Sequence, residues 1–297
     1  MGALMVWAGG FALLGAGVLG GLAPVWLWTG GILAGWGTVA LGGRWPGPWA
    51  AASALVAALL LAQALLQAYA VPAGLIPQPS LVGQALWTSY PVLLADAYTT
   101  LVQEALPGYL AGGASGILAG ALLARYEFLR RGLLPYAAAF ASVPIVALAP
   151  VAIHLLGLGW QSKALVAGVS VFFPVLVGTV SGLTQVKQPA LDLFSSYSAN
   201  QRQVFAALRF PAALPQIFNA LKIASTLALI GAIVAEFFGS QGSGLGFRIQ
   251  IEAGRFGFDL VWAAIAVASL LGIVWYGLVA ALERRLTGWH PSFREVK

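Results

Sequence analysis

The chain contains no cysteine and few charged residues. Without cysteine it can form neither a disulfide framework nor a thiolate metal site. Its only histidines are His154 and His290, so a multi-histidine metal site is also excluded. Charged residues make up 8% of the chain and apolar residues 60%, whereas about a quarter of the residues in soluble proteins are charged. This balance predicts a polytopic membrane protein without a metal site.

The motifs of several enzyme classes are also missing. No phosphate-binding loop GxxxxGK[ST] occurs, because GLGWQSK at 157–163 has neither the spacing nor the Gly-Lys pair. No HExxH, paired-carboxylate or nucleophile-elbow pattern is present. Basic residues lie at the ends of apolar runs and form no stripe interleaved with aromatics, so no nucleic-acid partner is expected. We predict that the chain is not an enzyme and binds no cofactor itself, and that a gradient or a partner supplies any energy for transport.

Apolar runs of about 20 residues separated by short polar gaps predict an all-α membrane helical bundle. A Gly-rich pair of runs over 1–45 is interpreted as an accessory transmembrane hairpin packed on the outside of the core, and residues 291–297 as a tail. The first run has no basic n-region, which argues against a signal peptide. One membrane domain over 46–290 is expected to contain the other six spans, at 49–71, 96–125, 134–156, 164–183, 216–238 and 260–282.

Within the second of these six spans a glycine recurs at every fourth residue, and Asp96 is expected to cap this helix. The resulting smooth face predicts backbone-to-backbone packing, in the bundle interior or across a dimer seam. The stripe consists of Gly108, Gly112, Gly116 and Gly120. Three prolines in the next two spans, Pro144, Pro150 and Pro174, either kink their helices or open backbone that lines a cavity.

The segment 187–215 differs from the apolar runs on both sides of it. It carries Asp192 and several polar residues, and Pro211 and Pro215 follow. As a helix, residues 200–209 are expected to place Val204, Phe205 and Leu208 on one side. The other side would carry Gln201, Arg202 and Arg209. Such an amphipathic helix can lie at the membrane surface and bind a soluble partner.

This segment resembles the cytoplasmic signature of bacterial ABC-importer permeases, known as the EAA motif. Asp192 stands at the acidic position, Ser198 at the glycine position, and 208–211 (LRFP) at the closing apolar-x-Leu-Pro positions. Leu193 and Phe194 replace two small residues of that pattern. Flanking stretches resemble the nitrate, taurine and alkanesulfonate branch of these permeases in the same order, at 142–150, 157–159, 172–183, 211–215, 235–247 and 283–289.

The resemblance covers roughly 76–289 and implies a six-helix permease core in the bacterial inner membrane. It implies a dimer of ABC ATPase subunits that binds ATP and Mg²⁺, an extracytoplasmic substrate-binding protein, and a second permease copy forming a homodimer. The residues it assigns to ATPase docking are Asp192, Ser198, Asn200, Gln201, Arg202, Phe205, Arg209 and Pro211. With this segment in the cytoplasm, the positive-inside rule places both termini there and leaves Lys163, Arg248 and Arg255 outside.

Five residues are candidates for the substrate pathway. Glu104, the best intramembrane carboxylate, either lines a cavity or pairs with a polar group of another helix. His154 contacts substrate or is hydrogen-bonded at the membrane interface. Glu236 forms a gate or loop anchor, or contacts substrate. Phe172 and Phe173 narrow the pathway or pack in the core.

The resemblance leaves the substrate open between two classes. The run over 236–265 and the tail ERRLTGWHPS look closer to members that carry vitamin precursors or riboflavin, which favours an aromatic heterocycle. A small anion such as a sulfonate, nitrate or bicarbonate is the alternative. A gradient-driven carrier that uses Glu104, or a structural protein without transport, would instead need no ATPase.

Overall fold

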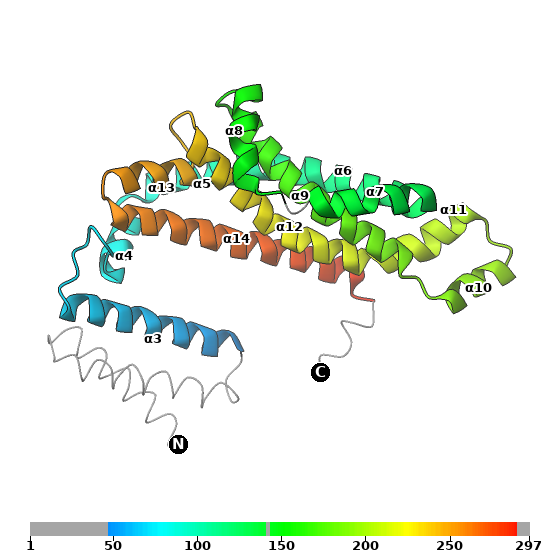
Figure 1. Ribbon diagram of the computed structural model, residues 1–297. Helices are drawn as coiled ribbons and strands as arrows, with labels where there is room; N and C mark the ends of the chain where they lie inside the picture. The colour runs from blue at the N-terminus through cyan, green and yellow to red at the C-terminus, as the bar shows by residue number, and fades with distance from the viewer. Residues whose placement is uncertain (1–46, 141–142, 290–297) are drawn as a thin grey trace, which may run out of the picture. The chain divides into compact units, whose positions relative to one another are not determined.

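The computed structural model describes residues 47–140 and 143–289 (Figure 1). Every regular element in these ranges is a helix. The predicted hairpin over 1–45 and the predicted tail over 291–297 lie outside the described residues. The described residues form two compact units. The smaller contains the residues up to Tyr90 and Ile251–Ala264, and the larger contains Pro91–Gln250 and the residues from Ile265 on.

The smaller unit contains α3 (Gly47–Ala68) and α4 (Pro79–Thr88). Gln63 of α3 is buried and fixes the connection between the two helices. Its Nε2 donates to Gln78 Oε1 (2.8 Å), and its Oε1 accepts from the backbone N–H of Ser80 (3.0 Å). The connection between α3 and α4, which contains Pro72 and Pro77, is not helical up to Gln78. Pro79 then starts α4, because a proline in the first helical turn loses no hydrogen bond.

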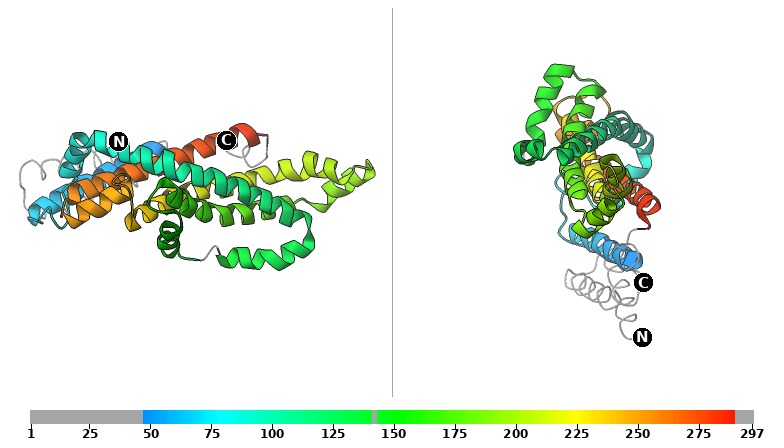
Figure 2. Two further views of the ribbon diagram at one scale, coloured as in Figure 1. Left: turned by 90° about the horizontal axis from the view of Figure 1, so that it is seen from above. Right: turned by 90° about the vertical axis from the view of Figure 1, so that its right-hand side faces the viewer.

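The larger unit contains the remaining helices, of which α13 and α14 extend across both units. They are α5 (Tyr90–Tyr98), a π-helical stretch (Thr99–Ala105), α6 (Leu106–Arg125), α7 (Glu127–Phe140), α8 (Ile145–Leu156), α9 (Trp160–Thr184), α10 (Gln188–Ser196), α11 (Gln201–Val204), a second π-helical stretch (Phe205–Arg209), α12 (Phe210–Phe238), α13 (Leu245–Gly254) and α14 (Phe258–Thr287). Helices α6, α9 and α12 lie side by side (Figures 1 and 2). They form the centre of this unit.

The glycine stripe of α6 packs directly on the backbone of α9. A Cβ atom at Gly108 would overlap the carbonyl oxygen of Ala164, and one at Gly112 would overlap that of Gly168. At Gly116 it would lie 2.8 Å from the Phe172 carbonyl oxygen, and at Gly120 2.7 Å from the Thr179 Cβ. Lipid is as apolar as leucine, so helices in a membrane associate through close contacts of this kind. The stripe therefore holds α6 and α9 together inside one chain.

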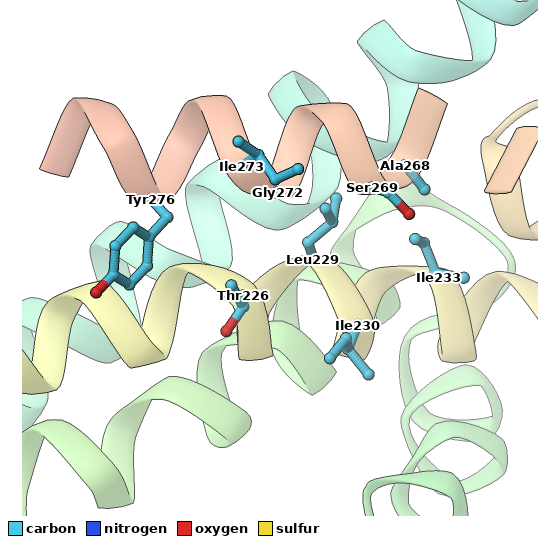
Figure 3. A pocket seen from close by; sticks show the side chains of 9 residues that line it. All are labelled: Thr226, Leu229, Ile230, Ile233, Ala268, Ser269, Gly272, Ile273 and Tyr276. Atoms are coloured by element: carbon cyan, nitrogen blue, oxygen red, sulfur yellow. The ribbon is translucent and has the colours of Figure 1, made fainter. Parts of the chain in front are cut away.

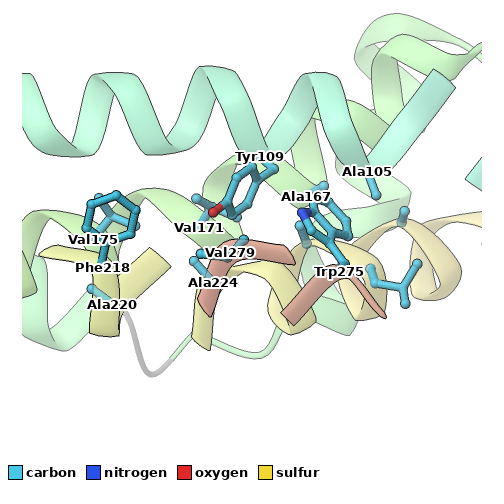
Figure 4. Packing of buried hydrophobic residues seen from close by; sticks show 13 residues of the cluster. Ala105, Tyr109, Ala167, Val171, Val175, Phe218, Ala220, Ala224, Trp275 and Val279 are labelled. Atoms are coloured by element: carbon cyan, nitrogen blue, oxygen red, sulfur yellow. The ribbon is translucent and has the colours of Figure 1, made fainter. Parts of the chain in front are cut away.

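Aromatic side chains complete the core where α14 joins these helices (Figure 4). The rings of Tyr109 and Trp275 meet edge to face, with centroids 5.0 Å apart. The Tyr109 hydroxyl donates to the Leu221 carbonyl oxygen (3.2 Å), so this buried polar group is satisfied. Near the C-terminal end of α14, Glu283 forms an ion pair with Lys222 of α12 (2.6 Å). Both side chains are largely buried.

Five described segments are long and apolar enough to cross a membrane, and α8 is a shorter apolar helix. The five are Ala51–Ala68, Tyr90–Arg125, Trp160–Thr184, Gln201–Phe238 and Phe258–Thr287. Two predictions were wrong in detail. The expected span over 134–156 is two helices, because Val143 and Pro144 are not helical. Asp96 lies inside the segment that begins at Tyr90 and does not cap it.

Each π-helical stretch ends shortly before a proline. Thr99–Ala105 precedes Pro107, and Phe205–Arg209 precedes Pro211. Proline lacks an N–H donor, and its ring clashes with the carbonyl four residues earlier in an α-helix. A wider turn moves that carbonyl away, so both helices continue through their prolines. The last helix of the predicted docking segment is therefore continuous with the following span over Gln201–Phe238, which has 38 residues and begins well before the expected residue 216.

Candidate functional site

The predicted docking segment forms a hairpin of two helices, α10 and α11, which we call the docking hairpin (residues 188–204). It extends beyond the other helices of its unit (Figures 1 and 2). Asp192 is exposed on α10, and its Oδ1 accepts from Gln188 Nε2 (2.9 Å). Leu193 and Tyr197 are exposed as well, with 55% and 79% of their surface accessible. The hairpin thus presents a mixed acidic and apolar surface.

The turn of the docking hairpin is built by Ser198 and Asn200. Ser198 has φ = 51°, a left-handed conformation that favours glycine, and it stands at the glycine position of the motif. Asn200 then caps α11 in a reciprocal capping box with Gln203. Gln203 N–H donates to Asn200 Oδ1 (2.9 Å), and Asn200 N–H donates to Gln203 Oε1 (2.8 Å). The direction of the second helix is therefore fixed at its first residue.

The predicted division of this helix into two faces was wrong. Gln201, Phe205 and Arg209 line the same cavity, because residues four apart lie on one helical face. Val204 is buried on another side, and Arg202 is exposed. Arg125 of α6 lines this cavity as well.

A second cavity of about 980 Å³ lies beside the glycine stripe and is rich in aromatic side chains; we call it the aromatic cavity. Phe172 and Phe173 of α9 line it, with their ring centroids 5.0 Å apart and nearly perpendicular. Phe140 of α7 stacks on Phe173 at 5.6 Å with an interplanar angle of 7°. Trp160 lies at the start of α9 and also faces the cavity. No charged residue belongs to the cavity lining in the described ranges, so its walls suit a flat, apolar molecule.

Farther along the same unit, buried polar side chains hold the loop before α13. Three successive backbone N–H groups each find a side-chain acceptor. Gly244 donates to Asp96 Oδ1 (2.9 Å), Leu245 to Thr100 Oγ1 (2.8 Å), and Gly246 to Glu236 Oε2. Negative groups at a helix N-terminus also interact favourably with the helix dipole. We call this arrangement the loop anchor.

Two further contacts complete the loop anchor. Thr100 Oγ1 donates to Glu236 Oε1 (2.7 Å), and Arg248 forms an ion pair with Asp96 Oδ2 (2.8 Å). Gly244 has φ = 112°, and a Cβ atom there would overlap the carboxylate of Glu236. Glycine is therefore needed at this position both for its backbone conformation and for the close approach. In this network the carboxylate of Glu236 holds the loop, as the loop-anchor alternative expects.

Glu104 and Lys163 extend this buried cluster. The carboxyl groups of Glu104 and Glu236 are neighbours in this cluster. Glu104 Oε2 is buried, and among the described residues no donor group reaches it. Lys163 is fully buried, and its Nζ donates to the carbonyl oxygens of Leu158 and Gly159. Glu104 thus belongs to a packed polar cluster and not to the lining of the aromatic cavity.

The remaining features are simpler. His154 is exposed in the last turn of α8 and does not line the aromatic cavity. A groove of about 430 Å³ runs between α12 and α14, where Tyr276 and Leu229 face it from opposite sides (Figure 3). None of the predicted pathway residues lies in this groove. Sequence reasoning missed Asp96, Thr100 and Lys163 as members of a polar cluster, because their partners are far away in the chain.

Residues 116–288 match the family described as "Binding-protein-dependent transport system inner membrane component". The chain is 32% identical to the riboflavin transport system permease protein RibX of Chloroflexus aurantiacus, over 74% of this chain and 82% of that protein. It is 34% identical to the formylaminopyrimidine transport permease protein ThiX of Halalkalibacterium halodurans, over 60% of this chain and 70% of that protein. The family match covers the docking hairpin and the residues of α7, α8 and α9 that line the aromatic cavity.

The fold is also similar to that of a solved transporter. A chain of the inward-facing MetNI methionine ABC transporter superposes with a TM-score of 0.55, covering 71% of this chain and 99% of that one. The two sequences are 18% identical, so the likeness concerns the fold alone.

Proposed function

Since the chain belongs to the family of binding-protein-dependent transport system inner membrane components and is a permease subunit of an ABC importer, we propose that it carries an aromatic heterocycle across the inner membrane. The substrate would be riboflavin or a pyrimidine vitamin precursor. The observation that carries this proposal is the aromatic cavity, whose Phe140, Phe172, Phe173 and Trp160 rings can stack on a flat ring system.

The absence of basic residues from that lining argues against a strongly anionic substrate. A sulfonate, nitrate or bicarbonate needs hydrogen-bond donors or cations to replace its hydration shell. In the described part of the chain, the aromatic cavity offers only Ser115 and Gln161 as polar side chains. The two relatives named above are a riboflavin and a formylaminopyrimidine permease, which agrees with a heterocycle.

Energy for transport would come from a partner ATPase that binds ATP and Mg²⁺. The docking hairpin is the surface for that partner, with Asp192 and Arg202 exposed on its two helices. Because α11 is continuous with α12, a displacement of the hairpin would be transmitted directly into a spanning helix. Two permease copies, two ATPase subunits and an external binding protein would form the complete importer, with both termini of the permease in the cytoplasm.

Reconstitution in liposomes tests the proposal. The purified chain is combined with its candidate ATPase, and ATP hydrolysis is followed as binding protein loaded with riboflavin, a pyrimidine or a sulfonate is added. We expect stimulation by one of the heterocycle-loaded forms. Replacing Phe172 or Trp160 with alanine should lower transport about five- to tenfold, since an aromatic contact contributes about 1 kcal/mol. Stimulation by the sulfonate alone would identify an anion importer.

Docking needs a separate test. We expect the double variant Asp192→Ala, Arg202→Ala to lose ATPase binding in a pull-down from detergent. A matched control, Asp259→Ala with Arg285→Ala, removes the same two charges from exposed positions outside the hairpin and should retain binding. If the wild-type chain binds no ATPase and uptake instead collapses with an uncoupler and in Glu104→Gln, the chain is a gradient-driven carrier.

A further inference from the structure

The cavity next to the docking hairpin differs from the aromatic cavity in charge and position. It has a volume of about 550 Å³ and lies where α6, α9 and the helix beginning at Gln201 meet. Its lining residues are Leu118, Ala121, Leu122, Ala124, Arg125, Tyr126, Leu183, Gln201, Phe205 and Arg209. None of them lines the aromatic cavity. We call it the arginine cavity.

The positive charge in the arginine cavity is not compensated. Arg125 and Arg209 both line it, and no carboxylate belongs to its lining in the described ranges. Nε of Arg209 is buried, and no described residue accepts a hydrogen bond from it. A buried charged donor without an acceptor destabilises the folded chain, because its hydration is lost and not replaced. An anion that enters the cavity would remove this cost.

The nearest acidic side chain in sequence is already engaged elsewhere. Glu127 forms ion pairs with Arg131 (2.7 Å) and Arg130 (2.6 Å), and these bonds lower the pKa of its carboxyl group. Glu127 is therefore ionised at neutral pH and paired with two arginines of its own helix. The guanidinium carbon of Arg125 lies 5.6 Å from the centroid of the Tyr126 ring.

The other half of the cavity is apolar. Leu118 and Leu122 lie on successive turns of α6 and are 72% and 53% exposed. They belong to the spanning segment Tyr90–Arg125 and lead from the charged end towards its middle. A ligand that satisfies both halves has an anionic group at one end and hydrocarbon at the other. An acidic side chain of a soluble protein would fill only the charged end.

We propose that the arginine cavity binds an anionic phospholipid, with the phosphate at Arg125 and Arg209 and an acyl chain along Leu118 and Leu122. Guanidinium groups bind phosphate oxygens through paired hydrogen bonds. Basic pockets between spanning helices at a membrane surface are suited to lipid head groups. Because Gln201 lies in the docking hairpin and Phe205 and Arg209 follow directly on it, the bound lipid stabilises the base of that hairpin. This last consequence rests on the proposed function, but lipid binding itself does not.

Native mass spectrometry of the purified full-length chain tests the lipid site. The detergent-solubilised protein is titrated with dioleoyl phosphatidylglycerol or dioleoyl phosphatidylcholine, and the bound lipid is counted. We expect at least one phosphatidylglycerol to bind about tenfold more tightly than phosphatidylcholine. Arg209→Gln and Arg125→Gln should each reduce this preference to about twofold or less. Arg285→Gln removes an exposed charge outside the cavity and should leave the preference unchanged.

Three outcomes would overturn the proposal. Equal binding of the two lipids by the wild type would show that the cavity does not select an anionic head group. Displacement of phosphatidylglycerol by millimolar inorganic phosphate would identify a site for free anions. Retained lipid preference with lost ATPase binding in Arg125→Gln would assign the two arginines to a protein contact. Thermal unfolding of each variant separates these outcomes from misfolding, and Arg125 is exposed enough to be replaced without loss of packing.

Discussion

Replacing Glu236 with glutamine tests whether its carboxylate anchors the loop before α13. Its two oxygens accept from the Thr100 hydroxyl (2.7 Å) and from the Gly246 N–H. Glutamine keeps the shape but has one acceptor oxygen, so its amide nitrogen must face one of these donors. A hydrogen bond to a charged group contributes about 1.5–3 kcal/mol, and its loss leaves a buried donor unpaired. We therefore expect the loop to open more easily by about 3 kcal/mol.

Hydrogen exchange measures this opening directly. A change of about 1.4 kcal/mol is a factor of ten in an equilibrium constant, so the amides of Gly244, Leu245 and Gly246 should exchange about 100-fold faster in Glu236→Gln. Amides in the packed centre of α6 and α9 should be unaffected. Exchange at residues 244–246 that is unchanged within about threefold would show that Glu236 does not hold this loop.

Glu104→Gln is the matched comparison. Two carboxyl groups in contact form a hydrogen bond only when one carries a proton, and Glu236 already acts as an acceptor towards two other groups. Glu104 therefore supplies the donor, and glutamine can replace it through its amide N–H. We expect exchange at residues 244–246 to rise less than tenfold. A larger rise than in Glu236→Gln would refute this assignment of donor and acceptor.

Three further changes test the fold and the docking hairpin. Ser198→Gly should raise the free energy of unfolding by about 0.5–1 kcal/mol, because glycine adopts a positive φ without strain; a lower melting temperature would contradict the turn geometry. Gly112→Ala should destabilise the chain by about 1–3 kcal/mol, because the added methyl group forces α6 away from α9. Gly277 has open space around it, so Gly277→Ala should not destabilise the chain. Equal melting temperatures of the two variants would argue against the contact between α6 and α9. Glu283→Gln leaves Lys222 largely buried without its ionised partner and should lower the free energy of unfolding by about 3 kcal/mol. Changing both residues of the pair to leucine should recover most of this loss. Thermal unfolding in detergent measures the stability of both variants.

Features that depend on local spacing could be predicted from the sequence. Apolar runs of sufficient length gave the approximate positions of the spans, because hydrocarbon thickness fixes the length of a helix that crosses it. The four-residue spacing of Gly108 and Gly112 predicted a backbone contact, and the structure places α9 there. The motif places Ser198 at a glycine position, and its positive φ in the structure gives the physical reason why glycine suits that position.

Features that depend on long-range contacts could not be predicted. Asp96 and Arg248 are 152 residues apart, and Thr100 and Glu236 are 136 apart, so no local pattern links them. Asp96 was therefore expected to cap a helix, which is the common role of an aspartate before an apolar run. At Val143 and Pro144 a kink or opened backbone was expected and not a complete helix break, since a proline alone does not show whether neighbouring contacts preserve the helix.

The wide turn before Pro211 also sets the direction of the docking hairpin. Successive residues of an α-helix are rotated by about 100° around its axis, and a π-helical turn holds one residue more than an α-helical one. The single extra residue within Phe205–Arg209 therefore turns everything before it by roughly a quarter of a circle relative to α12. The number of residues in this one turn thus determines the direction in which Asp192 and Tyr197 face a partner. The surface of the hairpin itself does not determine that direction.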